Sequence, residues 1–125
     1  MIVYQSRIFR ADLRANPNVL YVFGDNAIRK GFGGQAKEMR GEPNARGVAT
    51  KWYPSNHPNA FFSDRQYDDA IKIIDEDTFD ILLALRFHKT VVFPLDGIGT
   101  GLSELPTRAP KIYEYICKLG LGAQT

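Results

Sequence analysis

The sequence predicts an α/β domain built on a sheet whose neighbouring strands run parallel and are joined by right-handed crossovers. Two observations lead to this prediction. Continuous β-prone runs at 19–23 and 90–93 are typical of strands buried on both faces. Each run is followed by a glycine-rich loop and then by a segment of helix formers, so strand, loop and helix alternate along the chain.

Three strands and one helix are predicted in the first half of the chain. Residues 2–4 form a short edge strand, residues 19–23 a buried strand, and residues 46–50 a weaker strand. Between the last two, the glycines of 31–34 form a turn. This turn opens into a helix at 35–40, because those residues are good helix formers and a glycine follows them.

The second half begins with a loop at 52–63 that is rich in proline, asparagine and aromatic residues. A long helical stretch follows, which we expect the acidic run at 75–77 to divide into two helices. After the strand at 90–93, a final helix is predicted at 106–119, with Cys117 on its apolar face and therefore in the core.

The composition is that of one globular domain spanning residues 1–125. The 125 residues are 44% hydrophobic and carry 16 Lys and Arg against 14 Asp and Glu, a net charge of +2. These values exclude a disordered chain and give no strong nucleic-acid signature. The longest apolar run, at 81–85, is too short to cross a bilayer, so we expect no membrane partner.

The first residues and the single cysteine predict a cytoplasmic, reducing location. The N-terminus has neither a charged region followed by an apolar stretch nor a cleavage signal. Cys117 alone permits no internal disulfide and no cysteine-cluster metal site. Because His57 and His88 are far apart in the sequence with no third ligand in evidence, no metal site is expected. No cofactor is predicted either.

Two glycine-rich loops predict a site for a diphosphate. The first contains Gly31, Gly33 and Gly34, and the second spans 97–101. The carboxyl ends of strands form the ligand crevice of an α/β sheet, and glycine lets the backbone approach a phosphate closely. The helix that follows each loop presents free N–H groups. The alternative is two ordinary turns, since neither G-x-G-x-x-G nor G-x-x-x-x-G-K-[ST] occurs.

The residues around both loops resemble the macrodomain family. Residues 24–36 are similar to the macrodomain segment in which an asparagine-containing strand end leads to a glycine cluster and a helix. Residues 91–105 are similar to the second macrodomain loop, where a strand ending in Phe-Pro precedes Ile-Gly-Thr-Gly. Thr50 and Lys51 stand where one branch of the family has a Thr-Lys pair. That branch contains the terminal ADP-ribose protein glycohydrolase and the DNA ADP-ribosyl-removing antitoxins.

The resemblance implies a macrodomain-like three-layer fold, with a mixed sheet between helices on both faces. It also implies a pocket for ADP-ribose or a related nucleotide diphosphate ribose, either free or on an ADP-ribosylated macromolecule. Asn26 would approach the distal ribose, and Lys51 matches the lysine that attacks the anomeric carbon of an ADP-ribosyl ester. The other implied ligand-binding residues are Gly31, Gly33, Gly34, Thr50, Gly97, Ile98, Gly99, Thr100, Gly101, Leu102 and Ser103.

The chain departs from this branch in the second loop. Ser103 occupies the place of the aspartate that completes turnover, which leaves Asp96 and Glu104 as the carboxylates that could assist water. A binding module or ligand sponge without turnover is therefore an alternative. A third hypothesis is a nucleoside-monophosphate phosphoribohydrolase, whose phosphate loop resembles residues 97–104 but is one residue shorter. The adenine contact is unassigned, although a ring of the loop at 52–62 could stack on it.

For several side chains near the loops, the sequence leaves more than one role open. Lys51 is a nucleophile if aromatic neighbours desolvate it and lower its pKa; otherwise it is a cation for a ligand phosphate or a solvated lysine. Asp25 and Asp96 accept hydrogen bonds from ribose hydroxyls, act as a general base, or simply cap turns. Arg29 and Lys30 neutralise a phosphate or form a solvated pair.

Overall fold

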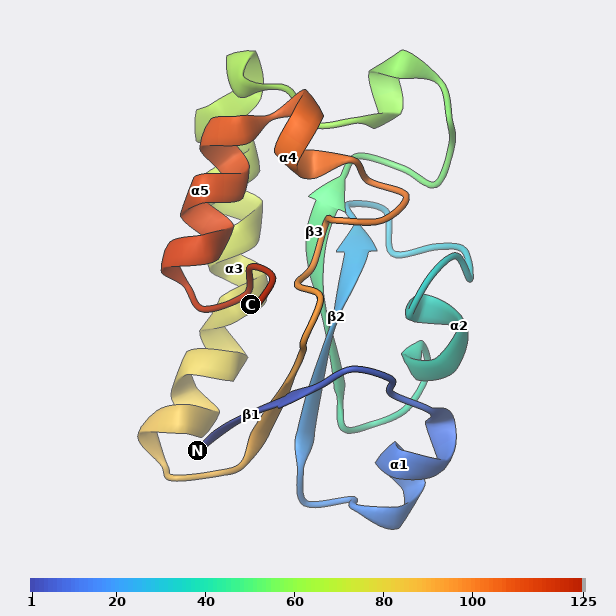
Figure 1. Ribbon diagram of the computed structural model, residues 1–125, viewed down its shortest axis with the longest axis vertical. Coiled ribbons are helices and arrows are strands. Elements are labelled where there is room, and N and C mark those ends of the chain that lie inside the picture. The colour runs from blue at the N-terminus through green and yellow to red at the C-terminus, as the bar shows by residue number, and fades with distance from the viewer. Residues whose placement is uncertain (125) are drawn as a thin grey trace.

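The computed structural model describes residues 1–124 and contains a four-stranded sheet (Figure 1). Its strands are β1 (Ile2–Gln5), β2 (Leu20–Asn26), β3 (Ala45–Lys51) and β4 (Val91–Pro94), in the spatial order β1-β4-β2-β3. All pairings between them are parallel, which confirms the α/β class and the parallel neighbours. The expectation of a mixed sheet is wrong for these strands, because a helical crossover returns the chain to the same end of the sheet before each new strand.

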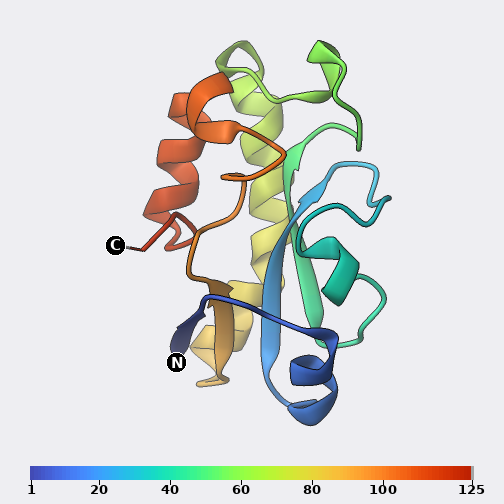
Figure 2. The same ribbon diagram turned by 45° about the vertical axis from the view of Figure 1, so that its right-hand side comes forward.

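Helices cover both faces of the sheet (Figures 1 and 2). The two helices α1 and α2 lie on one face, and the longer helices α3 and α5 lie on the other. Their bounds are α1 (Arg10–Ala15), α2 (Ala36–Met39), α3 (Tyr67–Arg86), α4 (Leu105–Arg108) and α5 (Pro110–Lys118), with 3₁₀ turns at Pro58–Ala60 and Asp64–Gln66. Among residues 1–124, no helix is long and apolar enough to cross a membrane.

Alternate side chains of β2 point to opposite faces of the sheet, as the pleat of a strand requires. Val22 is buried in the cluster that includes Ile74 of α3 and Ile112 of α5. Tyr21 and Phe23 are buried in the opposite cluster, which contains residues of α1 and α2. This two-sided burial explains why the strand reads as a continuous apolar run in the sequence.

The acidic run at 75–77 does not divide α3, contrary to the expectation from the sequence. Two of its carboxylates have partners that hold the helix in place. Asp75 accepts a hydrogen bond from the Tyr115 hydroxyl of α5. Asp77 accepts one from the backbone N–H of Ala49, 2.8 Å away, and pairs with Arg29. These contacts tie α3 to α5 and to the outer edge of β3.

Two other expectations about the helices are wrong. The predicted helix at 106–119 is divided into α4 and α5, because Pro110 has no N–H to continue the first helix. Cys117 is exposed rather than buried. The buried face of α5 is formed by Ile112 and Ile116, and the next residue is rotated by about 100° from it. Helix α1 was not predicted, since Leu13 is its one buried residue.

The contact between α3 and α5 predicts a loss of stability in alkali. The hydrogen bond to Asp75 and burial raise the pKa of Tyr115 to about 12 from its ordinary value of 10.0. The protonated phenol is therefore favoured in the folded state. Its contribution to the free energy of unfolding should be complete below pH 10 and disappear between pH 10 and about 12. Urea denaturation across this range should show a smaller pH dependence for Tyr115→Phe than for the wild type, and equal slopes would contradict the assignment.

Candidate functional site

A cleft opens at the carboxyl ends of β2 and β4, which are neighbours in the sheet. These strands pair only through Leu20 with Val91 and Tyr21 with Val92, and they separate beyond that point. The chain leaves β2 for α2 on one face and leaves β4 for α5 on the other. Adjacent strands with connections to opposite faces define a topological switch point, where α/β sheets bind ligands. The cavity there has a volume of about 530 Å³.

Both glycine-rich loops line this one cleft. They touch each other: a Cβ at Gly33 would lie 2.9 Å from the Cδ1 atom of Leu102. Gly99 has a φ of +78°, and a Cβ there would lie 2.8 Å from Leu105. The sequence-predicted candidates that line the cleft are Asn26, Gly31, Gly33, Gly34, Thr50, Lys51, Asp96, Gly97, Ile98, Gly99, Thr100, Gly101, Leu102 and Ser103.

The first glycine loop is held by a buried ion pair that the sequence did not suggest. Arg40, just after α2, contacts Asp25 at 2.5 Å, and its Nε donates to the carbonyl of Gly31 at 2.8 Å. The Asp25 carboxylate also accepts the N–H of Asn26. Asp25 therefore positions the loop through Arg40. No local pattern links two residues fifteen positions apart, so only the tertiary structure shows this pair.

Asn26 shapes the same loop. Its Nδ2 donates to the carbonyl of Lys30 at 2.7 Å, and its Oδ1 accepts from the Lys30 N–H at 3.4 Å. Both ends of the amide are thus engaged with backbone, although Asn26 lines the cleft. The sequence left open whether Arg29 binds a phosphate. In the structure Arg29 makes a bidentate contact with Asp77, so its side chain belongs to an ion pair and is not a free phosphate ligand.

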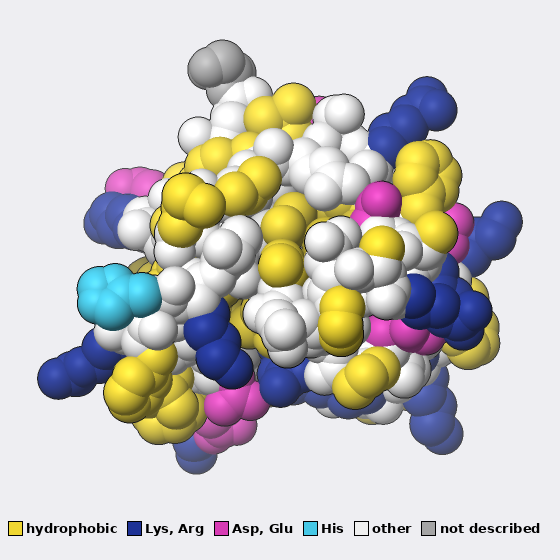
Figure 3. Space-filling view, turned by 90° about the horizontal axis from the view of Figure 1, so that it is seen from below, with side chains coloured by type: hydrophobic (Ala, Val, Ile, Leu, Met, Phe, Trp, Pro, Cys, Tyr) yellow, Lys and Arg dark blue, Asp and Glu magenta, His cyan; other side chains and the backbone are white. Residues whose placement is uncertain are grey.

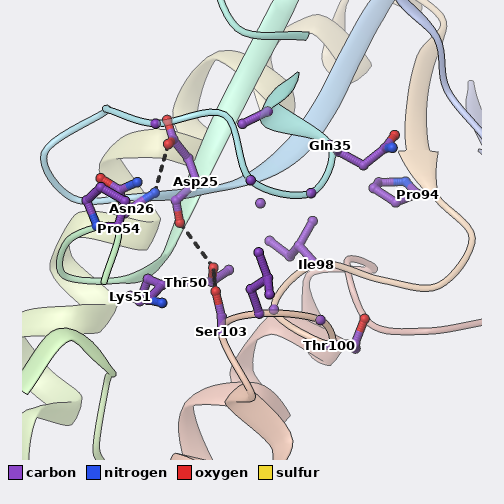
Figure 4. Close-up of a pocket in the computed structure, with 18 of the residues that line it drawn as sticks. Asp25, Asn26, Gln35, Thr50, Lys51, Pro54, Pro94, Ile98, Thr100 and Ser103 are labelled. Carbon is purple, nitrogen blue, oxygen red and sulfur yellow. Dashed lines mark hydrogen bonds between the residues drawn. The ribbon is translucent and has the colours of Figure 1, made fainter. Parts of the chain in front are cut away.

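Thr50 and Ser103 form a hydroxyl pair in the cleft wall (Figure 4). Thr50 donates to the carbonyl of Asp25 at 3.0 Å, and its oxygen lies 2.6 Å from that of Ser103. A hydroxyl has one proton, so Ser103 must donate to Thr50. The free positions on the Ser103 oxygen are then lone pairs only. Ser103 can accept a hydrogen bond from a ligand, but it cannot replace a carboxylate as a general base.

Lys51 ends β3 and is buried beside the cleft. Its Nζ donates to the carbonyl of Ser55 at 2.8 Å and lies 4.4 Å from the ring centre of Phe61. Arg108 stacks on the same ring at 3.6 Å. Burial lowers the pKa of Lys51, the Glu104 carboxylate opposes this, and the Arg108 guanidinium adds to it. The lysine is therefore not an ordinary solvated side chain.

The two candidate carboxylates differ in position. Asp96 is exposed and lines the cleft. Glu104 does not line it: this residue has a φ of +48°, and its half-exposed side chain lies 3.8 Å from Arg108. The structure therefore does not bring Glu104 together with the other candidates that line the cleft. Its charge influences Lys51 without facing the cavity.

Sequence reasoning missed several parts of the cleft wall. Gln35 and Pro94 lie at one end of the cleft, and Pro54 lies at the other end, near the predicted Lys51 (Figure 4). Ser6, which follows β1, also contributes to the wall, as do Ser55 and Asn56. The turn-forming pattern around residue 54 could have indicated a loop near the site. The aromatic rings considered for adenine do not line the cleft: those of Trp52 and Phe62 pack edge to face, 4.6 Å apart.

The lowered pKa of Lys51 predicts distinctive titration behaviour. After reductive methylation with ¹³C-formaldehyde, the NMR signal of Lys51 should titrate below the ordinary range of a lysine side chain, because burial lowers its pKa. Assignment by Lys51→Arg identifies the signal. If Lys51 titrates in the ordinary range of a lysine, its burial does not alter its chemistry and the nucleophile hypothesis loses its physical basis.

The comparisons with known proteins place the chain in a family without indicating an activity. No curated protein and no solved structure matches it. The model of one family, described as a family of unknown function (DUF7831), matches residues 3–119. That match covers nearly the whole domain, including both glycine loops and all four strands except the first residue of β1. The chain therefore belongs to the DUF7831 family.

Proposed function

We propose that the cleft binds ADP-ribose or a related nucleotide diphosphate ribose, as the macrodomain resemblance suggests. The observation that carries this proposal is the joining of the two glycine loops at one cavity, where Gly33 meets Leu102. Two backbone cradles on opposite sides suit a diphosphate, whose oxygens accept hydrogen bonds from N–H groups. A volume of about 530 Å³ lies within the range of small-molecule sites.

Isothermal titration calorimetry with ADP-ribose, AMP and NAD in parallel tests the proposal. We expect ADP-ribose to bind with the highest affinity, because AMP lacks the second phosphate and NAD carries an additional base. Saturable heat with ADP-ribose at micromolar concentrations would support the assignment. No heat at millimolar concentrations would remove it, and tighter binding of AMP would favour the nucleoside-monophosphate hypothesis.

Removal of ADP-ribose from a macromolecule is a second candidate activity. Buried Lys51, with its lowered pKa, is the observation in its favour, because a neutral amine is a nucleophile. Two observations stand against turnover: Ser103 is an acceptor only, and of the two candidate carboxylates that line the cleft, Asp25 and Asp96, the first is held in an ion pair with Arg40. Binding without turnover therefore comes first.

Lys51→Ala separates the two activities. If the protein is a hydrolase, this variant should lose release of ADP-ribose from an ADP-ribosylated acceptor while retaining affinity for free ADP-ribose. If the wild type shows no release above the rate without protein, the cleft is a binding site alone.

A further inference from the structure

Helix α3 exposes a second apolar face that the core does not use. Its buried face consists of Ala70, Ile74, Thr78 and Ile81. In its C-terminal half and at its C-cap, four apolar side chains are between 41% and 68% exposed: Phe79, Leu82, Leu83 and the capping residue Phe87. We call these four residues the outer α3 patch. Exposed apolar patches rimmed by polar residues are a feature of protein–protein interaction sites.

The outer α3 patch lies away from the cleft. Leu83 and Phe87 also line a shallow groove, of about 390 Å³, beside Pro17 and Leu20 at the amino end of β2. The cleft lies at the carboxyl ends of the strands. Seen from the lower end of the molecule, groups of hydrophobic side chains alternate with side chains of both charges (Figure 3). A partner on this side would leave the cleft open.

Charges of opposite sign flank the patch along one stripe of the helix. Glu76 precedes Phe79 by three residues, and Arg86 follows Leu83 by three. The 3-4-3 spacing of these four positions places them on one face, as in a helical seam. Glu76 and Arg86 are exposed, and neither belongs to an ion pair within residues 1–124. The stripe thus carries an acid at one end and a base at the other.

We propose that this stripe is the interface of a symmetric dimer, with a second copy of the chain as its partner. When two α3 helices pack antiparallel about a twofold axis, Phe79 of each copy lies opposite Leu83 of the other. The same register places Glu76 of each copy opposite Arg86 of the other, so two attractive charge pairs flank one apolar centre. A parallel arrangement would oppose like charges. In the antiparallel arrangement the stripe is complementary to itself, since apolar residues face apolar residues and each charge faces the opposite charge. For this reason we choose a second copy of the chain over another apolar partner.

Charge exchange at the two flanking positions tests the dimer. Sedimentation equilibrium of the wild type should show a reversible monomer–dimer equilibrium. Glu76→Arg and Arg86→Glu should each raise the dimer dissociation constant by about tenfold or more, since each substitution replaces two attractive pairs with two repulsive pairs. An equimolar mixture of the two variants should recover wild-type affinity as a heterodimer, because every charge then faces an opposite one.

The double variant Glu76→Arg/Arg86→Glu should also dimerise like the wild type. Both positions are exposed, so thermal denaturation should show that each variant is folded, and calorimetry with ADP-ribose should give the same heat for all of them. A wild type that stays monomeric at millimolar concentration overturns the proposal and leaves the patch to a different partner. A dimer that neither single variant weakens also overturns it. Neither result affects the proposed ligand, because the cleft is tested separately.

Discussion

Arg40→Ala should lower the free energy of unfolding by about 3–5 kcal/mol and the melting temperature by about 10 °C or more. The Asp25 carboxylate is 4% exposed and the Arg40 side chain 17%, so removal of the guanidinium leaves a buried charge without its partner. Breaking a buried pair in this way is among the most destabilising single changes. The loop at 30–31 also loses the hydrogen bonds that Arg40 donates to its carbonyls.

Arg46→Ala is the matched control for this substitution. Arg46 pairs with Asp80 at 3.4 Å, with side chains 37% and 60% exposed, and such surface pairs contribute about 0–1 kcal/mol. Chemical denaturation should therefore separate the two variants clearly. At a temperature where both are folded, Arg40→Ala should also bind ADP-ribose more weakly than Arg46→Ala, because it frees the first glycine loop. Equal stabilities for the two variants would contradict the role given to Asp25 and Arg40.

A double-mutant cycle isolates the pair itself. Asp25→Ala and Arg40→Ala should each be strongly destabilising, whereas the combined variant should lose much less than the sum of the two, because no unpaired charge remains buried. If the two losses simply add, the ion pair does not couple these residues.

Gly33→Val should weaken ADP-ribose binding by roughly 10- to 100-fold, because added methyl groups in a close-packed site cost about 1–3 kcal/mol. The new side chain would project to where the first loop meets the flexible end of Leu102. The backbone at Gly33 does not have a positive φ, so the fold should accept valine with little strain. Calorimetry measures the affinity, and thermal denaturation should show a melting temperature near that of the wild type.

Gly41→Val is the control for this substitution, and we expect it to lose stability while it keeps its affinity for ADP-ribose. Gly41 has a φ of +93°, and a Cβ there would meet nothing within 4 Å. Because a branched side chain is strained in this conformation, by about 1–2 kcal/mol, this variant should lose stability. It lies outside the cleft wall and should bind ADP-ribose like the wild type. Loss of affinity in Gly41→Val and not in Gly33→Val would show that binding depends on stability rather than on the space between the loops.

The sequence predicted most of the fold because local patterns carry most of its determinants. The buried strands β2 and β4 appear as continuous apolar runs, and the helix formers after Gly34 predict α2. The predictions from the sequence fail where tertiary contacts, and not the local sequence, determine where an element continues or ends. Helix α3 continues through its acidic residues because Asp77 binds the edge of β3, and no local pattern shows this. Proline at position 110 is a local signal for the end of α4 that could have been used.

The candidate site was likewise predicted only in part, and the predicted part is again the one with a local signal. The glycine positions were accessible from the sequence, since glycine after a buried strand indicates a close approach of backbone to a ligand. The Asp25–Arg40 pair and the Thr50–Ser103 hydroxyl pair join residues distant in sequence, and only the fold brings them together. The position of Glu104 outside the cleft depends on its left-handed backbone, which the residue type does not suggest.

Backbone amide NMR of the glycines can establish whether both loops hold one ligand. On titration with ADP-ribose, we expect the amide signals of Gly31, Gly33 and Gly34 to shift together with those of Gly97, Gly99 and Gly101, with one shared dissociation constant, while Gly41 and Gly120 stay unchanged. Shifts confined to one of the two loops, or shifts in neither, would contradict a diphosphate bound between them.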